Sequence, residues 1–160
     1  MTDRHMTDMT APSAAGPLAT RAAALVALAE RIPHDVIALC ARIFPAAVFW
    51  ASGQTKLEGW RVSESAVELF KEEYKLPLLD PTIGAHMAAF AETAFPILLV
   101  LGLASRLSAL ALLGMTLVIQ LLVYPGAWPT HGVWATCFLI VIARGPGRMS
   151  LDHLIFGAKR

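Results

Sequence analysis

The chain has 160 residues, of which 56% are hydrophobic and 16% are charged, and its mean hydropathy is +0.59. Soluble domains average about 45–50% apolar and about 25% charged residues, so a water-facing globule of this length could not bury the surplus apolar surface. The formal net charge of +1 and the lack of a basic block with interleaved aromatic residues leave no electrostatic case for a nucleic-acid partner.

The chain begins with a polar stretch in which Pro, Gly and Ser are scattered. We interpret residues 1–20 as a disordered cytosolic tail and residues 21–160 as one four-helix transmembrane domain. No apolar core with a small-residue cleavage site is present in the first 20 residues, so we expect no signal peptide. An apolar helix over residues 20–32 is expected to precede the first membrane span.

Four apolar segments follow, and we expect each of them to cross the bilayer as an α-helix. They cover about residues 35–52, 83–103, 107–124 and 127–143. A spanning helix needs about 17–25 mostly apolar residues, and the fourth segment reaches that length only if its Trp-Pro-Thr-His start lies in the outer interface. The expected fold class is an all-α membrane protein, a four-transmembrane-helix bundle with short amphipathic interfacial helices.

The longest loop, residues 53–82, separates the first two spans and contains an amphipathic stretch. Ser65 and Glu68 have the spacing of a capping box at the start of a helix. An apolar stripe then repeats at helical spacing in Val67, Phe70 and Tyr74. We expect a short helix on the membrane face or over the mouth of the bundle. A second surface helix, capped by Ser150, is expected near the C-terminus.

Lys and Arg are distributed unevenly between the two sides of the membrane. With both termini inside, eight of these residues are cytosolic and four are external. The cytosolic ones are Arg4, Arg21, Arg31, Arg106, Arg144, Arg148, Lys159 and Arg160, and the external ones are Lys56, Arg61, Lys71 and Lys75. The positive-inside rule therefore predicts a multi-pass protein of the bacterial inner membrane with cytoplasmic N- and C-termini.

Arg42 and Glu92 each lie well inside an apolar span. A lone charge at the bilayer centre costs at least about 2.5–3.5 kcal/mol. Arg42 lies about 10 Å from the cytosolic end of its span and Glu92 about 13–14 Å from the outer end of its own. In a hydrocarbon core of about 30 Å this leaves a gap of about 6 Å, which an extended Arg side chain bridges. We therefore predict a buried Arg42–Glu92 pair.

Two interpretations of this pair stay open. The pair either fixes only the register of the first two spans, or it lines a cavity that binds an anionic or quinone-like ligand or passes protons. A second polar group falls in the outer third of the membrane and includes Lys56, His86, Gln120 and His131.

The second group could bind a metal or hydrogen-bond a quinone carbonyl, although each side chain could equally be an interfacial residue with a local partner. His86 and Glu92 are about 240° apart around their helix, so one pocket cannot easily use both. We assign no metal site. Cys40 and Cys137 differ in depth by roughly 10 Å, too far for a disulfide, so we expect no bond between them.

The chain resembles the DoxX family of small bacterial membrane proteins over about residues 37–156. Three runs carry the resemblance: ARIFPAAVFWASGQTKL, AFAETAFPILLVLGLASRLSAL and HGVWATCFLIVIARGPGRMSLDHLI. The resemblance implies a four-helix inner-membrane protein. Function differs among family members, which include membrane subunits of thiosulfate:quinone oxidoreduction and proteins linked to thiol handling, oxidative stress or metal stress.

Three functions remain from the sequence, and it does not decide whether the protein is an enzyme. The first is a membrane subunit of a quinone- or thiol-linked redox system with a buried polar site. It would have no covalent cofactor, a bound quinone, and a soluble or membrane redox partner, because no side chain here carries electrons alone. The second is a non-catalytic anchor or assembly factor for a redox or metal-handling partner. The third is a small-solute or metal transporter, for which a homodimer would supply the missing repeat.

Overall fold

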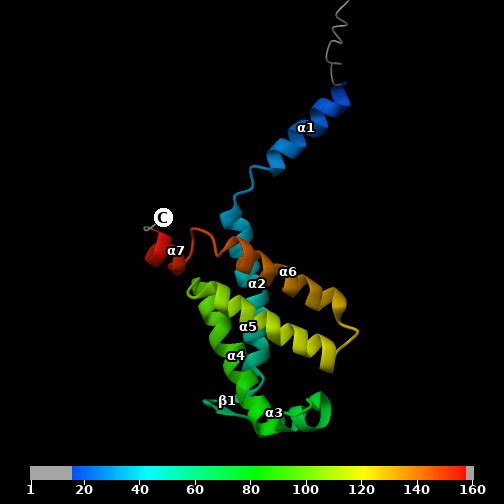
Figure 1. The fold of residues 1–160 in the computed structure, drawn as a ribbon, viewed down its shortest axis with the longest axis vertical. Helices are drawn as coiled ribbons and strands as arrows, with labels where there is room; N and C mark the ends of the chain where they lie inside the picture. The colour runs from blue at the N-terminus through cyan, green and yellow to red at the C-terminus, as the bar shows by residue number, and fades with distance from the viewer. Residues whose placement is uncertain (1–15, 158–160) are drawn as a thin grey trace, which may run out of the picture. The chain divides into compact units, whose positions relative to one another are not determined.

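The computed structural model describes residues 16–157. The expected tail over residues 1–15 and the last three residues therefore lie outside the described part of the chain. The chain divides into two units, residues up to 33 and residues from 34 onward, and each is described by itself (Figure 1).

The first unit contains the helix α1 (Pro17–Ala29). Pro17 occupies the first turn, where a missing N–H removes no helical hydrogen bond. The sequence predicted a helix here over residues 20–32, and α1 begins and ends three residues earlier. Residues 17–20, which the sequence assigned to the disordered tail, are therefore helical.

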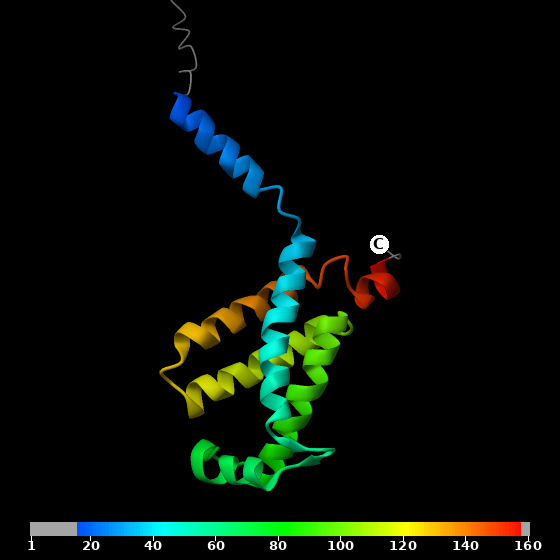
Figure 2. The same cartoon turned by 180° about the vertical axis from the view of Figure 1, so that it is seen from behind.

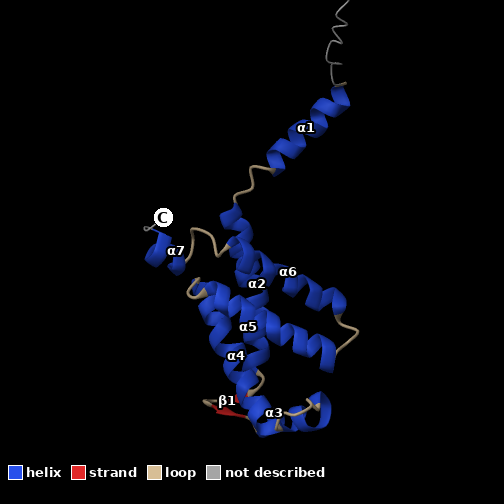
Figure 3. Cartoon of the chain, in the orientation of Figure 1, coloured by secondary structure: helices blue, strands red, loops and turns tan. Residues whose placement is uncertain are grey.

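The second unit is a bundle of four helices: α2 (His34–Gln54), α4 (Pro81–Leu101), α5 (Ser105–Val118) and α6 (Trp128–Arg144). A π-helical turn, η2 (Ile119–Val123), continues α5. The helix α2 packs most extensively on α4, and α5 packs on α6 (Figure 2). Figure 3 shows helix through most of this unit. The all-α fold expected from the sequence is confirmed.

Within residues 16–157, three helical segments are long and apolar enough to cross a membrane. They are α2, α4 and the continuous helix of α5 and η2. The fourth bundle helix, α6, has 17 residues and lies at the short end of the range for a spanning helix. Its start at Trp128 and Pro129 agrees with the expectation that this is the shortest span.

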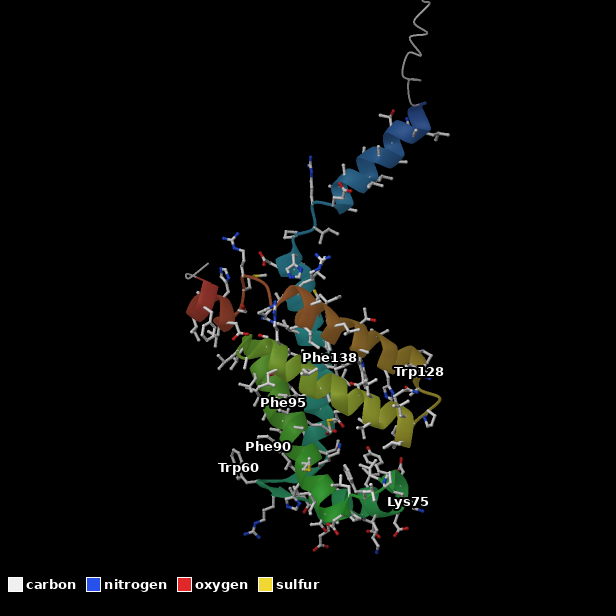
Figure 4. The ribbon with its side chains drawn as sticks, in the orientation of Figure 1. Trp60, Lys75, Phe90, Phe95, Trp128 and Phe138 are labelled. Carbon is white, nitrogen blue, oxygen red and sulfur yellow. The ribbon has the colours of Figure 1, made fainter. Side chains whose placement is uncertain are left out.

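Small residues fill the interfaces of the bundle, and large apolar residues cover its outside. Six alanines of α2 and α4 are almost fully buried: Ala38, Ala41, Ala46, Ala85, Ala88 and Ala89. Phe44 and Phe90 are instead about two-thirds exposed, at 67% and 68%. Membrane helices pack in this way because small side chains let the backbones approach while lipid solvates the large ones. Figure 4 labels Phe90 on α4 and Phe138, which is fully buried, within the bundle.

A connection of several short elements joins α2 to α4. It contains a hairpin of β1 (Leu57–Glu58) and β2 (Arg61–Val62), the helix α3 (Glu64–Leu69) and the π-helical turn η1 (Phe70–Tyr74). The predicted amphipathic helix is present, but its cap is Ser63, whose side chain accepts from the Ala66 N–H, and not Ser65. The hairpin was not foreseen.

The C-terminal end of the unit is a loop followed by α7 (Leu151–Phe156). Ser150 caps α7 by accepting a hydrogen bond from the His153 N–H at 3.2 Å, as the sequence predicted. Gly102, which follows α4, has a φ of +71° and lies against Ser150, so a Cβ there would be only 2.5 Å from the Ser150 Cβ. A glycine is therefore required where this loop meets α4.

Candidate functional site

Buried polar side chains gather at two ends of the bundle. We call the end where α2 stops and α4 begins the loop end, and the opposite end, where α4 stops and α5 begins, the C-terminal end. Lys56, Glu92, Gln120 and His131 are buried at the loop end, and Arg42 is buried at the C-terminal end.

An ion pair between Lys56 and Glu92 occupies the loop end. Lys56 Nζ lies 2.7 Å from Glu92 Oε2, and each side chain is only 4% exposed. Lys56 Nζ also donates to Ser52 Oγ at 3.1 Å. Because Lys56 lies two residues beyond the end of α2, its long stem turns back along the helix to reach its partner. Short charge-assisted hydrogen bonds of this kind offset part of the cost of burying both charges.

Gly53 lets α2 and α4 approach closely at the depth of this ion pair. A Cβ at position 53 would lie 2.9 Å from the Glu92 carbonyl oxygen and 3.0 Å from Glu92 Cβ, closer than carbon atoms pack. The same carbonyl lacks its usual donor in the helix, because the residue four positions later is Pro96, which has no N–H. Gly53 and Pro96 therefore help to set where the two helices touch and where Glu92 meets Lys56.

Gln120 and His131 form a second buried pair at the same end. The Gln120 amide nitrogen donates to the Pro125 carbonyl at 2.6 Å, which directs its oxygen toward His131 Nδ1 at 2.7 Å. A carbonyl oxygen only accepts, so His131 Nδ1 carries the proton and the neutral ring keeps a lone pair on Nε2. Gln120 lies in η2, and π-helical turns are frequent at functional sites.

Two tyrosines border the same region from outside the spanning helices. Tyr124 Oη donates to the Glu73 carboxylate, and the Tyr124 ring packs edge-on against Tyr74 with centroids 6.1 Å apart. The hydrogen bond to Glu73, followed by burial, raises the pKa of Tyr124 above the ordinary tyrosine value. Burial, followed by the charges of Glu92 and Glu73, raises the pKa of Tyr74. Both phenols therefore keep their protons at neutral pH, and Tyr124 donates its own to Glu73.

A cavity of about 130 Å³ lies between these groups. Its polar lining consists of Ser52, Tyr74, Glu92, Tyr124 and His131, and its apolar lining of Val48, Phe49, Ile119 and Trp134. The Trp134 ring packs edge-on against Phe49, with centroids 5.4 Å apart. Lys56 and Gln120 do not line the cavity but hold Glu92 and His131, which do. The cavity therefore combines aromatic walls with an imidazole, two phenols and a paired carboxylate.

Arg42 is not the partner of Glu92, and the predicted buried pair is wrong. Its guanidinium donates to three backbone carbonyls: those of Pro146 at 2.8 Å, Met149 at 2.9 Å and Val100 at 3.2 Å. Val100 lies eight residues beyond Glu92 on α4, about 12 Å along the helix. Both residues are buried as predicted, but each finds its partner at its own end of the bundle.

The physical reason lies in the end of α4. Val100 is in the last turn of the helix, where carbonyls lack helical N–H donors, and a cation is favoured there by the helix dipole. Arg42 supplies the missing donors and ties the loop after α6 to α4.

Two aspartates hold the same end together. Asp152 accepts from the backbone N–H groups of Ala104 and Ser105, both at 2.8 Å, at the start of α5. Asp35, in the first turn of α2, accepts from the Arg148 N–H at 2.6 Å. Together with Arg42, these contacts join the C-terminal segment to α2, α4 and α5.

Comparison with known proteins confirms the family resemblance seen in the sequence. A profile of the DoxX family matches residues 37–125. The chain belongs to the DoxX family. A relative described as an uncharacterized protein from Haemophilus influenzae is 31% identical over 139 residues, covering 79% of this chain and 87% of the relative. No solved structure matches the chain. Family membership agrees with the helical membrane bundle, and the relative's description states no activity.

The matched range of this DoxX protein contains Lys56, Glu92 and Gln120 but ends before His131. Four of the predicted site residues, Lys56, Glu92, Gln120 and His131, are brought together at the loop end. His86 is exposed on α4 and does not line the cavity, and its Nδ1 donates to the Thr82 carbonyl of its own helix at 2.8 Å.

The cysteines lie away from the cavity. Cys40 and Cys137 are both free thiols, and neither lines the cavity. Within residues 16–157, no group of three or more His, Cys, Asp or Glu side chains is placed to hold a metal ion.

Several cavity residues were not identified from the sequence. Tyr74 was recognised only as part of an apolar stripe, and Ser52, Tyr124 and Trp134 were not predicted as site residues. Each lies at or near a helix end facing the bundle, and a search for polar and aromatic residues at that depth would have found them. Figure 4 marks this end by Trp128 at the start of α6 and Lys75 after η1.

Proposed function

We propose that this DoxX protein is the membrane component of a quinone-linked redox system, and that the cavity at the loop end receives the headgroup of a quinone. The observation that carries the proposal is the lining of that cavity. Its aromatic walls suit a flat ring. The Tyr74 hydroxyl can donate to a ring carbonyl, and His131 Nε2 and the Tyr124 oxygen can accept from a ring hydroxyl.

The size of the cavity supports a small headgroup. A cavity of about 150 Å³ accepts a benzene ring, so about 130 Å³ suits one six-membered ring better than two fused rings. A benzoquinone ring is therefore favoured over a naphthoquinone, with its tail extending toward lipid.

The residues around the cavity support the handling of protons. Conversion between a quinone and a quinol moves two protons with two electrons. Tyr124 bonds to the exposed Glu73 and packs against Tyr74, and both tyrosines line the cavity, so these side chains link the cavity to the surface. The Lys56 ammonium holds Glu92 as a carboxylate acceptor. The electrons must come from a partner, because no side chain at the site carries them.

Thiol chemistry by this chain alone has less support. Cys40 and Cys137 lie outside the cavity lining, so a thiol donor would belong to the partner.

The orientation proposed with this function places both termini in the cytoplasm of a bacterial inner membrane. It is supported by Arg106, Arg144 and Arg148 at the C-terminal end and by the acid-rich connection at the loop end. A reporter enzyme that is active only in the periplasm, fused after residue 160, should be silent. Activity of that fusion would reverse the orientation.

Titration of purified protein with a short-tailed benzoquinone tests the proposal. Trp134 lines the cavity, so its fluorescence should be quenched saturably, and Trp134→Phe should remove most of that signal. We expect His131→Leu to weaken binding about tenfold, the loss of roughly one buried hydrogen bond. The matched control is His86→Leu, which removes an exposed histidine outside the cavity and should leave binding unchanged.

Two results would refute a quinone site here. One is quenching that rises linearly, as for quinone partitioning into empty detergent micelles. The other is equal binding by His131→Leu and His86→Leu. A stable partner in detergent pull-downs, combined with either result, would support the alternative of a non-catalytic anchor.

A further inference from the structure

A second and larger cavity lies at the C-terminal end of the bundle, away from the quinone site. It is an open groove of about 1010 Å³ between the starts of α2 and α5, the end of α6, and the segment that leads into α7. Three arginines line it: Arg106 near the start of α5, Arg144 at the end of α6 and Arg148 in the following loop. Elements far apart in the sequence therefore direct three guanidinium groups to one groove.

None of the three arginines has a carboxylate partner. All are exposed, and among residues 16–157 the ion pairs within 4.0 Å involve other residues, at Lys56–Glu92 and Lys71–Glu72. Asp35 and Asp152 also line the groove, but their oxygens accept from backbone N–H groups of Arg148, Ala104 and Ser105. The guanidinium donors are therefore left for an external anion, and planar guanidinium groups suit phosphate geometry.

The rim of the groove is apolar. Leu107 and Phe156 line it and are each 64% exposed, and Leu154 and Ile155 of α7 are exposed beside them. The groove also lies where the bundle helices end, the depth at which a bilayer places its headgroups. A ligand that joins a phosphate to hydrocarbon chains would satisfy both the arginines and this rim, whereas a free anion would use the arginines alone.

The loop that carries Arg148 is held in place before any ligand arrives. Arg42 binds the carbonyls of Pro146 and Met149 on either side of it, and Asp35 binds the Arg148 N–H. A site whose backbone is already fixed loses less conformational entropy on binding.

We propose that this groove is a binding site for the phosphate headgroup of an anionic phospholipid. Arg106, Arg144 and Arg148 hold the phosphate, and the acyl chains lie along Leu107 and Phe156. The site does not depend on the quinone-linked function, because its residues are separate from those of the loop-end cavity.

Thermal unfolding of the purified full-length protein in detergent tests the proposal. Phosphatidylglycerol, phosphatidylcholine and inorganic phosphate are added separately at equal phosphate concentration. Phosphatidylglycerol should raise the midpoint and the others should not, because a ligand that binds only the folded state stabilises it in proportion to its affinity. Each of Arg106→Gln, Arg144→Gln and Arg148→Gln should weaken phosphatidylglycerol binding roughly fivefold, the factor for about 1 kcal/mol per charge. The triple variant should lose the stabilisation.

A matched control triple removes three exposed cations at the loop end instead, through Arg61→Gln, Lys71→Gln and Lys75→Gln, and should keep the full response. If inorganic phosphate stabilises as well as phosphatidylglycerol, the site takes a soluble anion and the lipid assignment is overturned. An equal response to phosphatidylglycerol and phosphatidylcholine, or a response kept by the groove triple, also overturns it. Should the triple variant not fold, the three single variants decide, because binding unchanged in all of them contradicts the proposal.

Discussion

The two ends of the bundle each bury a cation, but they satisfy it in different ways. At the C-terminal end, Arg42 donates to three backbone carbonyls, so its partners are fixed parts of the fold. At the loop end, Lys56 binds the side chain of Glu92, and a cavity lies against that carboxylate. Carbonyls cannot change their protonation state or move away without unfolding a segment, whereas a carboxylate and an ammonium can do both.

The difference distinguishes the charge of Arg42, which is held by backbone, from the loop-end charges that we propose to be functional. A buried charge beside a cavity, with other titratable groups on the cavity wall, is the arrangement expected of a ligand or proton site. A buried charge that binds only backbone carbonyls is the arrangement expected of a structural contact between chain segments. The sequence marks Arg42 and Glu92 alike, as one charge in each apolar span, and only their partners distinguish them.

The largest effect on stability should come from removing the hydrogen bonds of Arg42. Arg42→Met leaves three carbonyls without this donor. We expect a loss of about 5 kcal/mol, because each buried acceptor left unsatisfied costs about 1–3 kcal/mol. The yield of monodisperse protein and the thermal midpoint in detergent measure this. Arg61→Met, which removes an exposed arginine of the hairpin, is the control and should change stability by less than about 0.5 kcal/mol. Equal stability of the two variants would contradict the structural role of Arg42.

A smaller effect is expected at the loop end. Glu92→Leu strands the Lys56 ammonium and should cost near the lower end of about 3–5 kcal/mol, because the lysine stem can move its charge toward water. Adding Lys56→Leu should restore part of the thermal midpoint, since no charge then remains unpaired. Adding Arg42→Leu instead should lower the stability further by the full effect of that single substitution, because the effects of distant substitutions are additive. Rescue by Arg42→Leu but not by Lys56→Leu would favour the Arg42–Glu92 pair that the structure lacks.

The smallest effect is spectroscopic. Tyr74 and Tyr124 are the two tyrosines of the chain, so tyrosinate absorbance reports on both. Their raised pKa values mean that the folded protein holds these protons more tightly than the unfolded chain does. The resulting stabilisation is present below the ordinary tyrosine pKa of about 10 and is lost as the pH rises through the folded values.

Absorbance should therefore rise only above pH 10 in the folded protein. Glu73→Gln should move the Tyr124 transition back toward the ordinary value, because it removes the carboxylate that accepts from the phenol. Glu72→Gln, at the neighbouring exposed position, should leave it unchanged. A single transition near pH 10 in the unmodified protein would show that neither phenol is held as described.

Much of this fold could be predicted from the sequence because a helix that crosses a bilayer needs an apolar segment of a fixed minimum length. The apolar runs, the Ser150 cap and the burial of Arg42 and Glu92 all follow from residue type and spacing. The partner of Glu92 did not follow, because spacing gives depth along a helix but not the path of a chain that turns back after it. The partners of Arg42 are backbone atoms, which have no sequence signature at all. The hairpin and the two π-helical turns were missed for the same reason, since tertiary contacts decide them.

Two of the hydrogen-bond partners of Arg42 are synthesised much later than Arg42 itself. Its carbonyl partners at Pro146 and Met149 lie 104 and 107 residues later in the chain. At a synthesis rate of about 5–20 residues per second, the guanidinium therefore waits roughly 5–20 s in or near the translocation machinery before its acceptors exist. A segment made about 100 residues after Arg42 therefore completes its set of partners, and truncation before Pro146 would leave the guanidinium with the Val100 carbonyl alone.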